Sequence, residues 1–141
     1  MHYRDPIYGP AEISEPALLD LLETRALQRL DSILQHGISG LVGVTNPTTR
    51  LEHSIGTMLL VRRLGGTLEE QIAALVHDVS HTAFSHVIDY VYDQHDSQAY
   101  HEQNKERYVA NTDLPCTLAR HGYDWQEVIN EDQYPILEQP G

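Results

Sequence analysis

The chain has 141 residues, and its 21 acidic against nine basic residues give a formal net charge of −12. This length favours one domain over 1–141, the hydrophobic content of 40% is ordinary for a globular protein, and no apolar run reaches the ~20 residues of a membrane span. The acidic surface should repel duplex nucleic acid. The single Cys116 excludes an internal disulfide, and the start of the chain lacks a signal-peptide pattern, so we expect a cytoplasmic protein.

The first third of the sequence predicts helices joined by short turns, with no clear alternating strand pattern of useful length. Residues 5–10 form a turn-rich entry that contains two prolines. The leucine spacing over 15–37 is typical of one or two amphipathic helices, and Gly37 is a suitable end. Residues 38–49 predict a loop rich in glycine and threonine, and loops of this length are often functional.

Two Thr-x-x-Glu patterns, beginning at Thr49 and Thr67, mark the next helices. In such a capping box the hydroxyl and the carboxylate satisfy exposed amides at a helix start. The first pattern predicts a helix over 51–64 and the second a helix over 68–78. A Gly-Gly turn between them would let the two helices pack side by side.

The remaining sequence has weaker signals. It predicts four more helices, over 83–94, 101–111, 113–120 and 124–130, followed by an end without regular structure.

The pair His77-Asp78 lies directly after the apolar run "IAALV", at the rim of the expected core. Burying an unpaired imidazole and carboxylate there would be costly, and a metal ion would compensate both. His53 lies near the start of the preceding capped helix, although periodicity alone leaves open whether it meets His77. Most histidines have structural or surface roles: we interpret His86 as a structural hydrogen-bonding residue and His95 and His121 as solvated.

The sequence "RLEHSIGT" (50–57), followed by "ALVHDVSHTAFSH" (74–86), resembles the HD-domain phosphohydrolases, and among them the deoxynucleoside triphosphate triphosphohydrolases. Three further motifs fit that branch in the same order, namely "DPIYG" (5–9), "LQRLDSILQHG" (27–37) and "YHEQ" (100–103). The resemblance covers about residues 5–103. It implies an all-α HD-domain helical bundle around one divalent metal ion, which could be Mn, Mg, Fe, Zn or Ni.

The resemblance also implies roles for individual residues. His53, His77 and Asp78 match three of the four metal ligands of the family. The other matches lie around the substrate: His81 and His101 flank the reacting phosphate, Arg50 contacts phosphate, Gln35 lies near the sugar, and Glu102 and Asp89 orient neighbouring histidines.

The implied function is hydrolysis of nucleotides, most simply (deoxy)nucleoside triphosphates, by attack of water on a phosphorus held by Arg50. His101 or His81 would assist the leaving group. Two alternatives remain: a hydrolase of nucleoside monophosphates or pyrophosphates, and a catalytically silent HD module that binds a nucleotide or a protein.

The fourth ligand of the family is an aspartate on a later helix, and no stretch of this chain has its pattern. The available carboxylates are Asp113, Asp124 and Asp132. We therefore expect the N-terminal part of a longer domain or a truncated gene product, with weaker metal binding than in a full-length relative and little or no hydrolysis. Apolar stripes over 18–34 and 72–76 would be partly exposed and would favour a homo-oligomer.

Overall fold

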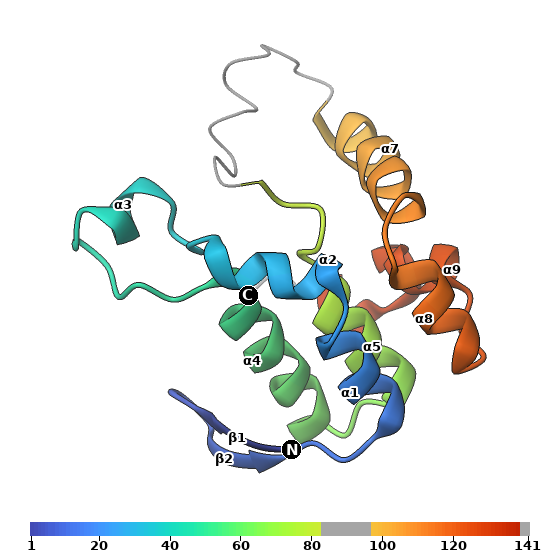
Figure 1. Cartoon of the computed structure of the whole chain (residues 1–141), viewed down its shortest axis with the longest axis horizontal. Helices are drawn as coiled ribbons and strands as arrows, with labels where there is room; N and C mark the ends of the chain where they lie inside the picture. The colour runs from blue at the N-terminus through green and yellow to red at the C-terminus, as the bar shows by residue number, and fades with distance from the viewer. Residues whose placement is uncertain (83–96, 139–141) are drawn as a thin grey trace.

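A computed structural model describes residues 1–82 and 97–138, and the side chains of these residues apart from 97–103 and 138. The described chain is mostly helical, as predicted (Figure 1). Its helices are α1 (Pro16–Leu22), α2 (Arg25–Gln28), α3 (Ile38–Leu41), α4 (Arg50–Arg63), α5 (Leu68–Val76), α7 (Ser97–Ala110), α8 (Leu114–Arg120), α9 (Trp125–Ile129) and α10 (Pro135–Glu138), with the 3-10 turns η1 (Arg29–Ser32) and η2 (Glu131–Gln133).

A short two-stranded antiparallel hairpin, β1 (His2–Asp5) and β2 (Gly9–Glu12), precedes the helices of this mostly helical fold, in a region where the sequence shows no clear alternating pattern. The turn is organised by Asp5, whose Oδ1 accepts hydrogen bonds from the amides of Ile7 and Tyr8, each at 2.8 Å. Gly9 has a φ of 77°, which favours glycine. The strands are too short to show an alternating pattern, which is why the sequence did not predict them.

The helical region predicted over 15–37 is divided into α1, α2 and η1. The Thr24 hydroxyl caps α2 by accepting from the amide of Leu27. The carboxylate of Asp113, next to α8, accepts from the amides of Arg25 at 2.7 Å and Ala26 at 3.3 Å. A partner far along the sequence therefore stabilises the start of α2.

Helices α4 and α5 form the predicted hairpin, and both capping boxes are present. The turn between the helices is tight. Gly65 has a φ of 82°, and a Cβ on Gly66 would lie 2.4 Å from Cγ1 of Val61. Only glycine at these positions brings the end of α4 so close to the start of α5.

The core lies where α1, α4 and α5 meet, and α8 and α9 cover it from the other side (Figure 1). Leu18, Leu21, Leu27, Leu30 and Leu75 are fully buried. The expected exposure of the stripes over 18–34 and 72–76 was therefore wrong, because these helices pack against one another and against α8 and α9.

The chain after the central helices differs from prediction in two places. Helix α7 begins at Ser97, not at residue 101 as predicted. The helix predicted over 83–94 lies outside the described residues and stays a prediction. The tail is not irregular, because η2 and α10 pack onto the core through Tyr134, whose hydroxyl donates to Oε1 of Glu69 at 2.9 Å. Burial, and then this contact with Glu69, raises the pKa of Tyr134.

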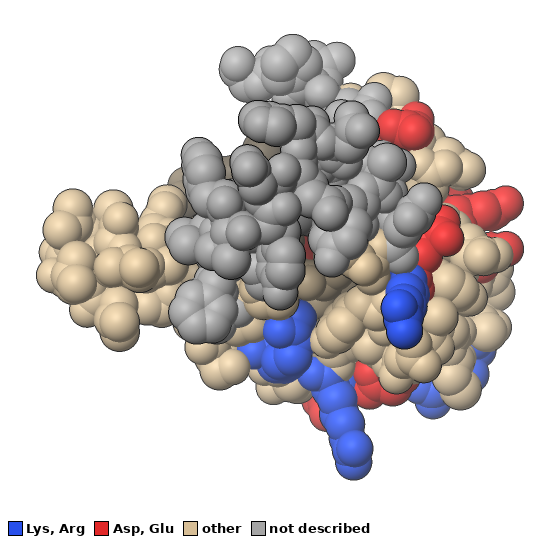
Figure 2. All heavy atoms as spheres, turned by 90° about the horizontal axis from the view of Figure 1, so that it is seen from above, with Lys and Arg blue, Asp and Glu red and all other residues tan. Residues whose placement is uncertain are grey.

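Basic and acidic side chains both occur on one face of the described surface. On the face drawn in Figure 2 the arginine and lysine atoms form separate small groups, and the acidic atoms gather toward one side. Within the described ranges, no helix combines the length and the apolar character that crossing a bilayer requires.

Candidate metal centre

His77 and Asp78 follow α5 directly, and His77 is its C-cap residue. The Nδ1 of His77 lies 2.6 Å from the carbonyl oxygen of Ala74, so Nδ1 carries the proton and donates it. The Nε2 atom is then left with a lone pair, and it lies 3.3 Å from Oδ1 of Asp78. This local hydrogen bond fixes the tautomer that a metal ligand needs.

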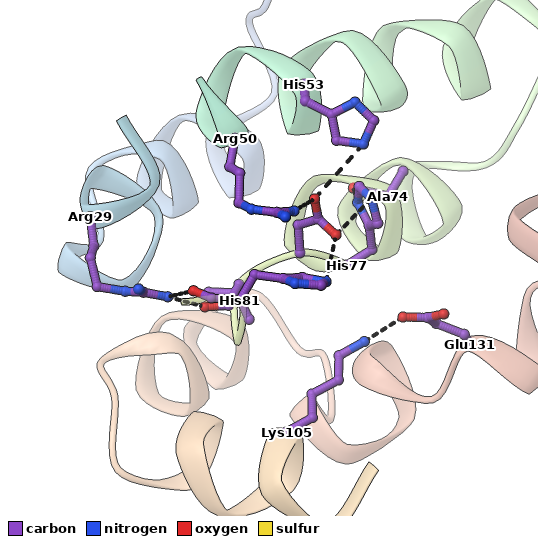
Figure 3. Close-up of polar contacts among 10 residues, drawn as sticks. Arg29, Arg50, His53, Ala74, His77, His81, Lys105 and Glu131 are labelled. Atoms are coloured by element: carbon purple, nitrogen blue, oxygen red, sulfur yellow. Dashed lines mark hydrogen bonds and ion pairs between the residues drawn. The ribbon is translucent and has the colours of Figure 1, made fainter. Parts of the chain in front are cut away.

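His53 approaches the same carboxylate from α4 (Figure 3). Its Nε2 lies 3.8 Å from Oδ2 of Asp78, and its ring centroid lies 5.3 Å from that of His77. Ligand atoms of His53, His77 and Asp78 all lie within 4.8 Å of one another. Two imidazole nitrogens and one carboxylate oxygen at this spacing fit a divalent transition metal. The hairpin therefore brings together the three ligands predicted from the sequence.

Asp78 is the central acceptor of the site. Arg50, which is 2% exposed, donates a hydrogen bond from Nη1 to Oδ2 of Asp78 at 2.7 Å. The Nε2 of His81 lies 3.3 Å from Oδ1. Burial of Asp78 acts to raise its pKa, but the field of His77, His81, Arg50 and His53 outweighs it and lowers the pKa below its usual value. The carboxylate is therefore ionised and ready to bind a cation.

The pKa of His53 is also lowered, chiefly because the ring is half-buried; the positive charge of Arg50, and any positive charge on His77, would act in the same direction. The attraction of Asp78 opposes this shift without cancelling it. His53 is consequently neutral at pH 7, which is the form that binds a metal.

Gln35 lies beside the start of α4, because its amide donates to the carbonyl of Thr48 at 2.8 Å. The amide of Arg50 similarly donates to the carbonyl of Ile33 at 2.7 Å. Within the described part of the chain, Oε1 of Gln35 is buried and has no hydrogen-bond partner. A ligand hydroxyl or amine could satisfy this acceptor.

Several residues named from the sequence cannot be placed in the site. His101 and Glu102 lie on α7, but their side chains are outside the described part, as are Asp89, His86 and His95 altogether. The interpretation of His121 as solvated was wrong. Its Nε2 pairs with Oδ2 of Asp20 at 2.8 Å, and its side chain is 21% exposed.

The three aspartates considered as a fourth ligand have other positions. Asp113 accepts from the amides at the start of α2, and Asp124 caps α9 through the amide of Gln126. Asp132 lies exposed in η2. Among the described residues, none of these carboxylates joins the cluster of His53, His77 and Asp78.

Arg29 lies in η1, within the motif 27–37, but the sequence analysis assigned it no role. Its side chain reaches the segment after Asp78. The Nη2 atom of Arg29 donates hydrogen bonds to the carbonyls of Val79 at 2.6 Å and His81 at 2.9 Å. No local pattern could have revealed it, because the contacts are made to backbone oxygens about 50 residues further along the chain.

Comparison with known proteins places these residues in a family. The family model described as "HD domain" matches residues 50–133, which include all three candidate ligands. The chain belongs to the HD domain family. The matched range contains His77-Asp78, at the end of α5.

Similar proteins include the metal-dependent phosphohydrolase cns2 of Cordyceps militaris, which is 49% identical over 97% of this chain and 39% of its own length. YdhJ of Bacillus subtilis is 45% identical over 99% of this chain and 43% of its own length. The deoxynucleoside triphosphate triphosphohydrolase SAMHD1 of Danio rerio is 37% identical over 62% of this chain and 16% of its own length. The chain thus spans about two fifths of the first two relatives.

Proposed function

We propose that this HD domain is the metal-binding part of a phosphohydrolase that acts on nucleotides, specifically on (deoxy)nucleoside triphosphates. The observation that carries the proposal is the convergence of His53, His77 and Asp78, whose ligand atoms lie within 4.8 Å of one another. The name of cns2, a metal-dependent phosphohydrolase similar over nearly the whole chain, supports the same chemistry.

The donor set suits one divalent cation, held by His53, His77 and Asp78. When bound, such an ion would supply Lewis acidity toward a phosphoryl oxygen and would lower the pKa of a bound water toward neutrality. A set of three protein ligands leaves room for water and substrate, unlike a closed structural site.

The remaining side chains have distinct proposed roles. Arg50 presents a planar guanidinium beside Asp78, and its fork suits the oxygens of a phosphate. His81 lies on the other oxygen of that carboxylate and can hold a proton for the leaving group. We assign the second proton-transfer role to His101 on α7, which the family resemblance alone supports.

The nucleotide specificity rests on two supports. SAMHD1 of Danio rerio is named a deoxynucleoside triphosphate triphosphohydrolase, and it is similar over 62% of this chain. The buried Oε1 of Gln35, without a partner among the described residues, could accept a hydrogen bond from a sugar hydroxyl. Both features favour a nucleotide over a simple phosphate ester.

The test combines metal analysis with an assay of a nucleotide panel. We expect stoichiometric metal in the parent protein, loss of it in His53→Ala, and retention in His2→Ala, because the His2 side chain is 92% exposed and far along the chain from the ligands. Release of inorganic tripolyphosphate identifies a triphosphohydrolase, whereas orthophosphate or pyrophosphate identifies the alternative hydrolases. A metal content that is equal in parent and His53→Ala would refute the site.

The variant His101→Ala addresses the mechanism separately. It should retain the metal and lower turnover by about 10²–10⁴-fold, the usual effect of losing a general acid or base. Turnover equal to that of the parent would remove His101 from the reaction.

A catalytically silent nucleotide-binding module is the second candidate, and one observation favours it. Arg50 already occupies Oδ2 of Asp78 at 2.7 Å, so an incoming cation must share this carboxylate with a buried guanidinium. Nucleotide binding without bound metal or product would support this reading. We also propose a cytoplasmic homo-oligomer, which light scattering of the purified protein would test.

A further inference from the structure

The Arg29 side chain connects three segments that are distant in sequence. It starts from η1, and its Nη2 atom donates hydrogen bonds to the carbonyl oxygens of Val79 and His81 at 2.6 and 2.9 Å (Figure 3). Its guanidinium carbon also lies 5.2 Å from the ring centroid of Tyr108 on α7. One side chain therefore contacts the segment that follows Asp78 and the helix that carries His101.

The segment after Asp78 has little regular structure to hold it. Helix α5 ends at Val76, and in the described residues up to 82 it is followed by single turns, from the amide of Val79 to the carbonyl of Val76 and from the amide of His81 to the carbonyl of Asp78. Val79 is fully buried, and a buried carbonyl needs a donor. Arg29 supplies a charged donor to the carbonyls of Val79 and His81, so it fixes the path of the backbone between Asp78 and His81.

The geometry points to indirect action of Arg29 on the site. Its Nη2 atom is directed to two backbone oxygens, and its guanidinium carbon lies over the ring of Tyr108, as a cation–π contact requires. The contacted backbone carries the Nε2 of His81 to 3.3 Å from Oδ1 of Asp78. A shift of this backbone would move the ligand and the proposed proton donor together.

We propose that Arg29 is a positioning residue: it fixes the turn 79–81, and with it Asp78 and His81, in the geometry required for metal binding and hydrolysis, and Tyr108 holds its guanidinium in place. The proposal rests on the proposed function for its catalytic part. Its structural part, the order of the turn and the affinity for metal, is independent of which substrate is hydrolysed.

The experiment compares Arg29→Ala and Arg29→Lys with Arg25→Ala, a matched control because Arg25 is an exposed arginine on the adjacent α2. Titration calorimetry with Mn²⁺ measures metal affinity, and hydrogen exchange measures protection of the amides of 79–82. We expect Arg29→Ala to lose about 10–100-fold in metal affinity, the usual effect of residues that orient ligands. Arg29→Lys should recover part of the affinity, and Arg25→Ala should match the parent.

Tyr108 offers a second pair of variants that leave Arg29 intact. Tyr108→Phe keeps the aromatic face and should match the parent, whereas Tyr108→Leu should increase exchange in the turn and weaken metal binding by a smaller factor. If Arg29→Ala, folded by circular dichroism, keeps the exchange protection and affinity of the parent, the proposal is overturned. Equal losses in Arg29→Ala and Arg25→Ala would also overturn it.

The design separates this proposal from the proposed function. A parent that binds Mn²⁺ but hydrolyses no nucleotide would refute the function, while the affinity and exchange data would still decide the role of Arg29. In an active parent, a positioning role predicts a lower kcat with little change in KM for Arg29→Lys. A change in KM alone would assign Arg29 to substrate binding and overturn the proposal.

Discussion

The α4–α5 hairpin and the segment 36–48 adjoin each other in the chain but are built in opposite ways. Both hairpin helices have complete capping boxes, and their facing sides are buried. The segment 36–48 contains only the single turn α3 and projects from the body of the molecule (Figure 1). Its apolar side chains are largely exposed, namely Ile38, Leu41, Val42 and Val44.

This contrast explains where the candidate ligands are found. A metal site requires donors held to within a fraction of an ångström, and residues on packed helices meet this requirement better than residues on loops. His53 lies within α4, and His77-Asp78 lies at the end of α5. Changes in the hairpin should therefore affect stability and metal binding together, whereas changes in the segment 36–48 should affect neither.

The largest effect is expected for Asp78→Ala. It removes the charged ligand and also the carboxylate partner of the buried Arg50. We expect loss of bound metal and a decrease of about 3–5 kcal/mol in the free energy of unfolding, the usual result of breaking a buried ion pair. Urea denaturation and metal analysis measure the two effects, with Leu41→Ala as the control. Full metal content in Asp78→Ala would contradict the assignment of the site.

The caps of the hairpin should have a smaller effect. Thr49→Ala and Thr67→Ala each remove the hydroxyl that accepts an amide hydrogen at a helix start. The expected cost is about 1 kcal/mol each in the free energy of unfolding. Ser39→Ala in the segment 36–48 is the control, and a cost equal to that of the caps would refute the contrast between the two regions.

The metal-free protein should lose stability as the pH falls below 6.5. The pKa of His53 is lowered in the folded state, so the unfolded chain takes up this proton first, and protonation stabilises the unfolded chain relative to the folded one. The loss should stop once the pH is below the folded pKa. Asp78 acts in a separate window, because its lowered pKa gives a contribution that disappears only as the pH falls below 3.8. Denaturation midpoints for the parent and His53→Gln between pH 8 and 5 test this, and parallel curves would contradict it.

The smallest effect on stability is expected for Leu41→Ser combined with Val42→Ser. Both side chains are largely exposed, so the free energy of unfolding should change by less than about 0.5 kcal/mol. If this apolar surface contributes to the proposed homo-oligomer, the variant should be less associated than the parent. Light scattering at several concentrations measures the change, and a large loss of stability would show that the segment belongs to the core.

The sequence predicted features that depend on local chemistry. The capping boxes at Thr49 and Thr67 and the Gly-Gly turn determine the hairpin from residues within one helical turn of each other. Because the hairpin sets the distance between α4 and α5, the meeting of His53 with His77 and Asp78 followed from the same signals together with the family resemblance.

Features that depend on distant partners were not predicted. The start of α2 is stabilised by Asp113, the tail packs through the bond of Tyr134 to Glu69, and Arg29 contacts carbonyls of the turn 79–81. His121 belongs to the same class, because its partner is Asp20 on α1. Such contacts form only once the helices are assembled, and periodicity contains no information about them.

The tight turn at Gly65 and Gly66 also sets the angular phase of α5. Because α5 starts at a fixed point relative to α4, the direction of His77 is determined by how many residues separate it from the cap at Thr67. One residue inserted within Leu68–Val76 would rotate His77 and Asp78 by about 100° about the helix axis, away from His53. The length of α5 is thus as important for the metal site as the identity of its ligands. An insertion in the segment 36–48 would rotate none of the three candidate ligands in this way.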